Sequence, residues 1–260
     1  MSWLAVILLA LVEGLTEFLP VSSTGHMILV SSLLGIENQP FVQHYQIIIQ
    51  FGAILSVLVL YWEKFKSWNP LYIKILAAFL PTAIIGFLFK SSFEALLGSP
   101  LVVSFSLIVG GFIFLGMEKY FKESDLTRKM EDLSFRHCVY LGLFQCFALV
   151  PGVSRAGATI IGALLLKMNR KEAAEFSFFL AVPTLAAASL YKGVKALPQI
   201  DSSQILFLVV GSLISFFVAM LAIKFFVQWI ARSGFVFFGW YRILLGFIFL
   251  FYLYWPQFSI

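Results

Sequence analysis

Charged residues are scarce in this chain, and their scarcity excludes an ordinary soluble domain. Only 12% of its 260 residues are Asp, Glu, Lys or Arg, against roughly 25% in soluble proteins. Hydrophobic residues make up 61% of the sequence, which predicts an integral membrane protein. The apolar runs are long and lack the period-two alternation of a membrane barrel, so we expect the protein to cross the membrane as helices.

Cysteines and amino-terminal basic residues are also few. Cys138 and Cys146 lie in one apolar segment, and their eight-residue spacing in a helix corresponds to about 12 Å, which is too far for a disulfide. No basic residue precedes the first apolar run, and no small-residue cleavage site follows it. We therefore expect this segment to belong to the mature protein rather than to a signal peptide.

Six apolar runs are long enough to cross a membrane, which takes about 20 residues per helix. They cover residues 41–62, 71–89, 100–117, 172–191, 203–230 and 236–255. Two other apolar stretches are broken by proline, near Pro20 and Pro151, into pieces that are short for a span. Broken backbone at membrane depth must line a cavity enclosed by protein. We therefore expect two re-entrant helix hairpins, each entering and leaving by the same face.

The second half of the sequence repeats the first. With a shift of 132 residues, Ser22 falls on Ser154 and Gly25 on Gly157, while the pentapeptide Gly-Phe-Ile-Phe-Leu recurs 135 residues further along. A hairpin followed by three spans gives an odd number of crossings, so the two halves must have inverted topology. The sequence thus predicts an all-α membrane protein of about ten helices and six full spans. Its single domain, 1–260, comprises a first repeat at 1–117, a charged cytoplasmic connector at 118–134 and a second, inverted repeat at 135–260.

Basic residues are distributed unevenly between the two ends of these helices. If the loop that begins at Lys64 is cytoplasmic, most other basic residues lie on its side, and only Lys90, Lys192 and Lys195 lie opposite. The positive-inside rule then places both termini outside the cytoplasm. The first hairpin would enter the membrane from outside and the second from inside, so that their tips meet in mid-membrane.

Two carboxylates in the first hairpin need a charge partner. Glu13 and Glu17 are four residues apart and therefore share one face of a helix. No Lys or Arg precedes Lys64, and unpaired carboxylates facing lipid would be untenable. The counter-charge must come from elsewhere in the fold, with Arg155 of the second hairpin the obvious candidate, or from a bound cation. The pair would either handle protons or ligate a hard divalent cation such as Mg²⁺ or Ca²⁺.

Each hairpin also contains a polar helix start. The first consists of Ser22, Ser23, Thr24 and Gly25, and the second of Ser154, Arg155 and Gly157. Helix N-termini favour anions, and a guanidinium can bind phosphate through two hydrogen bonds. Simple helix capping would equally explain Ser22. Together, however, two helix starts, several hydroxyls and one arginine predict a phosphate pocket.

His26 follows Ser23 by three residues. A single histidine is usually a packed or interfacial residue, and we expect this of His44 and His137. His26 differs because its neighbours include a hydroxyl and two carboxylates, the combination of nucleophile, base and orienting group used in covalent catalysis. The sequence leaves open whether Ser23, His26 or water is the attacking group.

The segments EGLTEFLPVSSTGH, residues 13–26, and PGVSRAGAT, residues 151–159, resemble the two signature motifs of the bacterial undecaprenyl-diphosphate phosphatase family, also called bacitracin-resistance proteins. The resemblance implies hydrolysis of a C55 polyprenyl diphosphate to the monophosphate and inorganic phosphate. It places this reaction at the outer face of the bacterial inner membrane, where it recycles the lipid carrier for peptidoglycan synthesis and confers bacitracin resistance.

The same resemblance implies roles for individual residues and for a cofactor. It assigns catalytic roles to the acidic pair Glu13 and Glu17 and to Ser23 as the nucleophile. It also assigns His26 as the acid–base residue and Arg155 as the arginine that grips phosphate. Ser154 and Thr159 match accessory polar residues that hold phosphate. A divalent cation is also implied, and Glu13 and Glu17 are the candidate ligands for it.

A transporter is the main alternative, because inverted repeats with paired broken helices are typical of transporters. The chain would then be a polyprenyl-phosphate flippase or an anion transporter, with or without hydrolysis. Ser23 and His26 favour an enzyme, since a carrier has little use for a nucleophile beside a base. The expected partners are the polyprenyl diphosphate and membrane lipids, with no nucleic acid. A homodimer stays open, because any protein in lipid has apolar outer faces.

Overall fold

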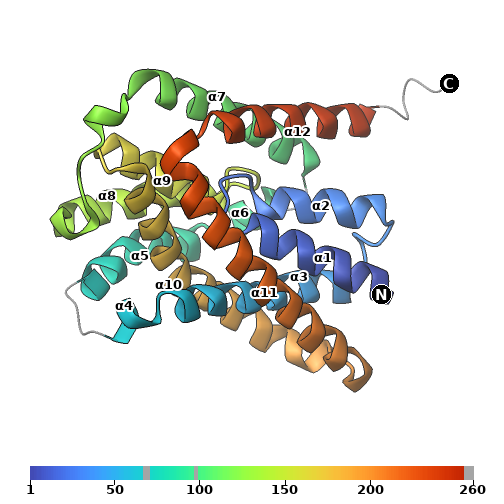
Figure 1. Ribbon diagram of the computed structural model, residues 1–260. Coiled ribbons are helices and arrows are strands. Elements are labelled where there is room, and N and C mark those ends of the chain that lie inside the picture. The colour runs from blue at the N-terminus through green and yellow to red at the C-terminus, as the bar shows by residue number, and fades with distance from the viewer. Residues whose placement is uncertain (67–70, 97–98, 255–260) are drawn as a thin grey trace.

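The computed structural model describes residues 1–66, 71–96 and 99–254, so the last residues of the predicted second repeat lie outside the described ranges. Within these ranges the chain forms twelve α-helices and four short 3₁₀ turns, arranged as a bundle (Figure 1). The only strand-like pairing among the described residues is an isolated bridge between Arg128 and Met168. The predicted all-α class is therefore confirmed.

Six of the described helices are long and apolar enough to cross a membrane, and each matches a predicted span. They are α3 (Pro40–Leu60), α5 (Leu71–Leu88), α7 (Pro100–Tyr120), α10 (Arg170–Ala196), α11 (Ser202–Ser233) and α12 (Val236–Tyr254). Two short helices, α4 (Trp62–Lys66) and α6 (Lys90–Leu96), were not predicted. The number of spans is the predicted one, and the structure describes a multi-pass membrane protein.

Four shorter helices form the two broken hairpins: α1 (Trp3–Thr16) with α2 (Ser23–Leu33), and α8 (Phe135–Cys146) with α9 (Arg155–Leu165). Both breaks end in the same way. Ser22 and Ser154 have φ angles of 69° and 76°, and each hydroxyl accepts a hydrogen bond from the amide three residues on, that of Gly25 or Gly157. Each serine therefore caps the helix that follows it.

The first helix of each hairpin packs against a span from the other half of the chain. Helix α1 lies along α11 and α8 lies along α5, while α3 packs on α10 and α11, and α7 on α12. Glycines permit the close approach: a Cβ on Gly14 would meet the carbonyl oxygen of Ser215 at 2.7 Å, and one on Gly142 would overlap that of Ala78. Small residues at helix contacts are characteristic of membrane bundles.

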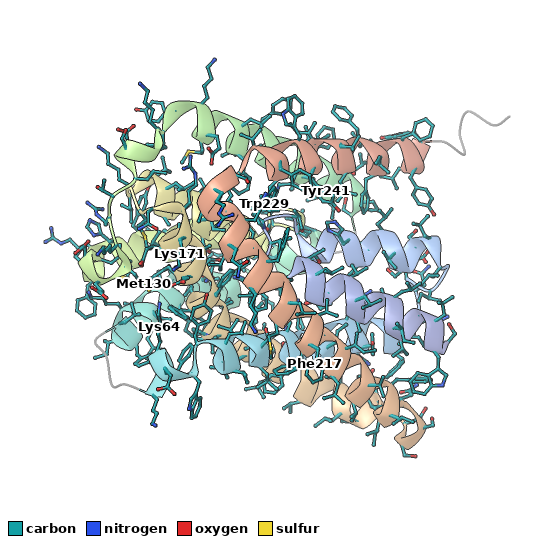
Figure 2. The ribbon with its side chains drawn as sticks, in the orientation of Figure 1. Lys64, Met130, Lys171, Phe217, Trp229 and Tyr241 are labelled. Atoms are coloured by element: carbon teal, nitrogen blue, oxygen red, sulfur yellow. The ribbon has the colours of Figure 1, made fainter. Side chains whose placement is uncertain are left out.

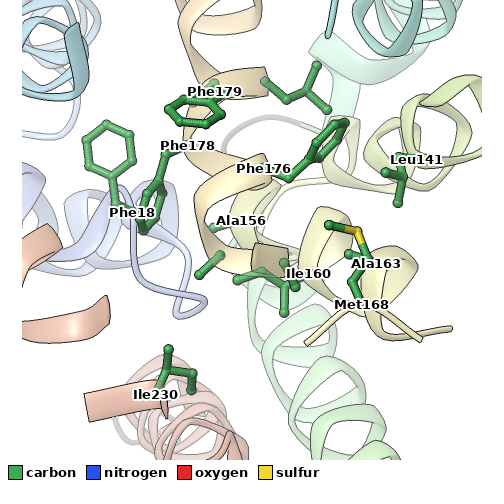
Figure 3. Packing of buried hydrophobic residues seen from close by; sticks show 14 of the residues in the cluster. Phe18, Leu141, Ala156, Ile160, Ala163, Met168, Phe176, Phe178, Phe179 and Ile230 are labelled. Atoms are coloured by element: carbon green, nitrogen blue, oxygen red, sulfur yellow. The ribbon is translucent and has the colours of Figure 1, made fainter. Parts of the chain in front are cut away.

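Aromatic packing holds the first break in place. Phe18, within the break, contacts Phe178 of α10 edge to face, with ring centroids 5.6 Å apart. Figure 3 shows these rings beside Phe179, with Ala156 and Ile160 of α9 in the same cluster. All are buried. The tips of both hairpins are thus anchored on one side by α10.

The two ends of the bundle differ in charge. The start of α1 and the end of α12 lie at one end of the molecule (Figure 1), whereas Lys64, Met130 and Lys171 lie at the opposite end (Figure 2). At that opposite end Lys64 pairs with Glu175 at 2.8 Å, and Arg170 binds both carboxylate oxygens of Glu118, at 3.1 and 2.8 Å. The connector around Met130, which includes the basic residues Arg128 and Lys129, lies at this end as well.

Candidate active site

A cavity of about 520 Å³ lies between the two hairpin tips. Helices α5, α6 and α10 complete its walls. The first break contributes Glu17, Ser22, Ser23 and Thr24, and the second contributes Ser154 and Arg155. Six of the residues predicted from the sequence therefore face one space, although the two segments are far apart along the chain.

Glu17 joins the two tips. Its Oε2 accepts a hydrogen bond of 2.5 Å from Ser23 Oγ, and its Oε1 forms an ion pair of 3.0 Å with Arg155 Nη2. The same Arg155 nitrogen also donates to the Glu17 carbonyl at 3.3 Å. One buried carboxylate thus contacts both a hydroxyl and a guanidinium, which is a geometry able to activate the hydroxyl beside a bound anion.

Arg155 is held from several sides. Its Nη1 donates to the carbonyl and the hydroxyl of Ser177 on α10, at 3.0 and 3.1 Å, and its guanidinium carbon lies 5.5 Å from the centre of the Phe18 ring. Thr159 donates to the Arg155 carbonyl at 2.8 Å. Because its orientation is fixed by these contacts, Arg155 presents a positioned charge to the cavity.

Glu13 lies one helical turn before Glu17 and is almost completely buried, with 1% of its surface exposed. Glu17 and Gln50 are its polar neighbours. Its Oε1, however, meets no donor among the described residues. A buried oxygen without a partner next to a second carboxylate is a place where a proton or a cation would be stabilised.

His26 is not among the cavity-lining residues, and both of its ring nitrogens are engaged outside the Glu17–Ser23 pair. Nδ1 lies 2.8 Å from the carbonyl of Ser22, and Nε2 lies 2.7 Å from the hydroxyl of Tyr241 on α12. A carbonyl can only accept, so Nδ1 carries a proton, and Nε2 of the neutral ring accepts from Tyr241. The ring therefore supports the backbone just before Ser23.

Three other predicted phosphate-binding residues also lie behind the cavity surface. Gly25 and Gly157 donate their amides to the capping serines, and Thr159 is fully buried. None of the three lines the cavity. Their positions suit residues that stabilise the two helix starts. Direct contact with a phosphate would come from the residues that line the cavity.

Arg242 of α12 was missed by the sequence analysis. It has no exposed surface and donates hydrogen bonds to a carbonyl in each break, those of Pro20 at 3.0 Å and Gly152 at 3.1 Å. A third bond of 3.1 Å reaches the Ser106 carbonyl on α7. An arginine inside an otherwise apolar span is a signal that could have identified it. It fastens the two tips to each other.

A second group of polar residues, also unpredicted, closes one wall of the cavity. The Gln145 amide donates to the hydroxyls of Thr82 and Thr184, at 2.9 and 3.1 Å, and all three residues line the cavity. With the sequence shift of 132 residues, Glu13 of the first half falls on Gln145 of the second. The carboxylate of one hairpin is therefore matched by a neutral amide in the other, and the site is chemically asymmetric.

Comparison with known proteins agrees with this geometry. The model of the family described as "Bacitracin resistance protein BacA" matches residues 6–248. An undecaprenyl-diphosphatase from Bdellovibrio bacteriovorus is 56% identical over 255 residues, which cover 98% of this chain and 97% of that protein. Undecaprenyl-diphosphatases from Flavobacterium johnsoniae and Persephonella marina are 44% and 47% identical, over 96% and 94% of this chain and 96% of each relative. This chain belongs to the bacitracin resistance protein family.

Proposed function

We propose that this chain removes the terminal phosphate of undecaprenyl diphosphate within the cavity between its two hairpin tips. The activity is that of its family, whose relatives above are undecaprenyl-diphosphatases. The observation that carries the proposal is the Glu17 carboxylate, which contacts Ser23 Oγ at 2.5 Å and Arg155 at 3.0 Å. Glu17, the proposed base, thus contacts both the proposed nucleophile and the arginine that would bind phosphate.

The proposed reaction starts with Ser23. As Ser23 Oγ bonds to the terminal phosphorus, its proton passes to Glu17 Oε2, and the bond from that phosphorus to the bridging oxygen breaks. Undecaprenyl phosphate leaves with the bridging oxygen, which takes the proton from Glu17 and so returns Glu17 to its carboxylate form. Water then attacks the phosphoserine and gives a proton to Glu17. The bond between Ser23 Oγ and phosphorus breaks, and Glu17 returns that proton to Ser23 Oγ as inorganic phosphate leaves. Arg155 stabilises the charge on the transferring group, assisted by the helix starts at Ser23 and Arg155, whose first amides have no intrahelical partner.

Lysine in place of Arg155 tests this function. Lys keeps the charge but cannot reproduce the planar fork that binds Glu17 and a phosphate together, so phosphate release from undecaprenyl diphosphate should fall by about 10²–10³-fold. The assay uses purified, folded protein in detergent.

Arg136→Lys is the matched control, because Arg136 is exposed at the start of α8, and it should keep the wild-type rate. Equal rates for Arg155→Lys and wild type would contradict the proposed role. Lipid transfer across a bilayer without any phosphate release would instead favour the transporter.

The acidic pair fits a divalent cation. Glu13 Oε1 has no hydrogen-bond partner in the part of the chain that the structure describes, and Glu17 lies beside it. The donors are therefore hard carboxylate oxygens of the kind that Mg²⁺ and Ca²⁺ prefer. No group of three or more His, Cys, Asp or Glu converges in the described residues, which suits an ion that keeps water and phosphate oxygens as its remaining ligands. Such an ion would supply positive charge to the diphosphate.

Chelation tests this part of the proposal. After treatment with EDTA, phosphate release should fall and return on addition of Mg²⁺ or Ca²⁺. Glu13→Gln should need a higher cation concentration for half-maximal activity. Full activity in EDTA-treated, cation-free enzyme would rule the cation out.

The inverted repeat and the orientation also belong to the proposal. Matching cap geometry at Ser22 and Ser154 and the reciprocal contacts of α1 with α11 and of α8 with α5 support two halves of opposite topology. The basic end of the bundle would face the cytoplasm. Both termini, and the cavity mouth with Lys90 and Lys192, would then face outward at the inner membrane.

Thiol labelling tests this orientation. Cysteines placed singly at the exposed positions Lys122 and Lys195, in a protein lacking Cys138 and Cys146, would be treated with a membrane-impermeant reagent on spheroplasts. Position 195 should react and position 122 should not. The reverse pattern would invert the topology and move the site to the cytoplasmic face.

A further inference from the structure

The cavity changes in character between its two ends. Glu17 and Ser23, at its inner end, are polar and buried. Phe87 of α5 also lines the cavity but is 79% exposed, and the lining residues Ala187 and Ala188 of α10 are exposed as well. Exposed apolar side chains on membrane-spanning helices face lipid. The outer part of the cavity is therefore open to the hydrocarbon layer of the membrane.

Helices α5 and α10 carry matched residues along this part of the cavity. Thr82 of α5 and Thr184 of α10 both line it, and the Gln145 amide donates to both of their hydroxyls. The end of α8 therefore lies between the two helices at this level. Gly86 and Ala188 each come four residues later and also line the cavity, so the pair one helical turn further along is small.

The gap between α5 and α10 stays open beside Gly86. In the described part of the chain, the contacts beyond its own helix that a Cβ here would make within 4 Å are with Leu149 of η3 (Phe147–Leu149), at 3.4 and 3.9 Å. No described atom of α10 lies that close. An apolar opening, which we call the side slot, is thus bordered by Gly86, Phe87, Leu149, Ala187 and Ala188.

The depth of the side slot in the membrane follows from the residues beyond it. Lys192 comes four residues after Ala188 on α10, which is about 6 Å along the helix. Tyr and Lys side chains near the ends of spanning helices lie at the level of the lipid head groups. The side slot is therefore just inside the hydrocarbon layer, where an apolar chain is more stable than in water.

We propose that the isoprenoid tail of the substrate leaves the cavity through the side slot while its diphosphate lies against Ser23 and Arg155. The inference rests on the proposed function, which places the diphosphate in this cavity. Because the slot continues into the cavity that holds Arg155, a lipid chain in the slot brings its head group beside a buried guanidinium. This favours a diphosphate lipid over a bulk phospholipid with a neutral head. The substrate then enters sideways from the bilayer, and its tail never crosses water.

Ala188→Phe tests the passage by narrowing it. KM for undecaprenyl diphosphate in detergent micelles should rise about tenfold or more, because the added ring takes the space of the tail. The kcat should stay within about threefold of wild type, because position 188 does not contact the reacting groups. Gly86→Leu narrows the slot from α5, where a Cβ has room, and should act in the same way. Ala231→Phe, at an exposed alanine of α11 outside the cavity lining, should match wild type.

Photo-crosslinking identifies the chain that fills the slot. Benzoylphenylalanine replaces Phe87 or, as a control, Phe217, which is 58% exposed on α11. With undecaprenyl diphosphate tritiated in its tail, light should attach label at position 87 and not at position 217, and excess phosphatidylcholine should not remove it.

Three results would overturn the passage: wild-type KM in folded Ala188→Phe and Gly86→Leu proteins, equal label at positions 87 and 217, or label lost to the phospholipid. The last two would assign the slot to bulk membrane lipid. Specific label at position 87 in a protein that releases no phosphate would instead overturn the proposed function and leave the passage standing.

Discussion

Replacement of Ser23 by alanine is expected to lower kcat for undecaprenyl diphosphate hydrolysis by about 10³-fold or more, as loss of an activated nucleophile does in other hydrolases. The variant keeps the cavity, Arg155 and the helix starts, so KM should change little. The reason is the 2.5 Å bond from Ser23 Oγ to Glu17, which alanine cannot make.

A labelling experiment distinguishes the attacking groups. With radioactive terminal phosphate, acid-quenched wild type should carry label on serine, and Ser23→Ala should carry none. Ser31→Ala is the matched control, because Ser31 is a buried serine on the same helix whose hydroxyl donates to the local carbonyls of Met27 and Ile28. A near-wild-type rate for Ser23→Ala would point to direct attack by water. Label recovered on histidine in a parallel alkaline quench, which preserves phosphohistidine, would point to His26.

Replacement of Arg242 by methionine is expected to lower the free energy of unfolding by roughly 3–5 kcal/mol, the range for breaking a buried polar network. The three carbonyls that Arg242 serves, those of Pro20, Ser106 and Gly152, would lose their donor. Each unsatisfied buried acceptor costs about 1–3 kcal/mol. Methionine fills similar space without a hydrogen bond.

The measurement is thermal unfolding in detergent, combined with the phosphatase assay. Both the unfolding temperature and kcat should fall, because the tips that hold Ser23 and Arg155 are no longer fastened together. Arg232→Met removes an exposed arginine at the end of α11 and should leave both unchanged. An Arg242→Met protein with wild-type unfolding temperature and full activity would show that packing alone, including the Phe18–Phe178 contact, holds the tips.

The spans and breaks could be predicted because each depends on local chemistry. Helix length follows from continuous apolar runs. Pro20 and Pro151 lie in the two breaks, where other polar and small residues also interrupt the apolar pattern, whereas Pro81 and Pro183 lie inside α5 and α10. The contact between Glu17 and Arg155 could be predicted from the sequence repeat and from the absence of basic residues before Lys64. Those arguments needed only residue types and spacing. Helices α4 and α6 were missed because pieces of five and seven residues leave no clear periodic pattern.

The contacts of Arg242 and His26 could not be predicted, because neither backbone carbonyls nor a distant tyrosine can be recognised as their partners from the spacing of residue types. Arg242 binds backbone carbonyls, which every residue possesses, and one arginine hardly lowers the hydropathy of its span. His26 follows Ser23 closely in sequence, which suggested a shared task. The orientation of its ring is set instead by Tyr241, which lies 215 residues away. Packing between distant segments therefore decides which residues that are close in sequence also form side-chain contacts.

The crossed contacts of the hairpin helices have a consequence for how the chain can be divided. Because α1 lies against α11 and α8 lies against α5, each half uses the other as its scaffold, and no cut through the connector would leave two autonomous modules. Glu17 and Ser23 belong to one half and Arg155 to the other, so neither carries the whole machinery.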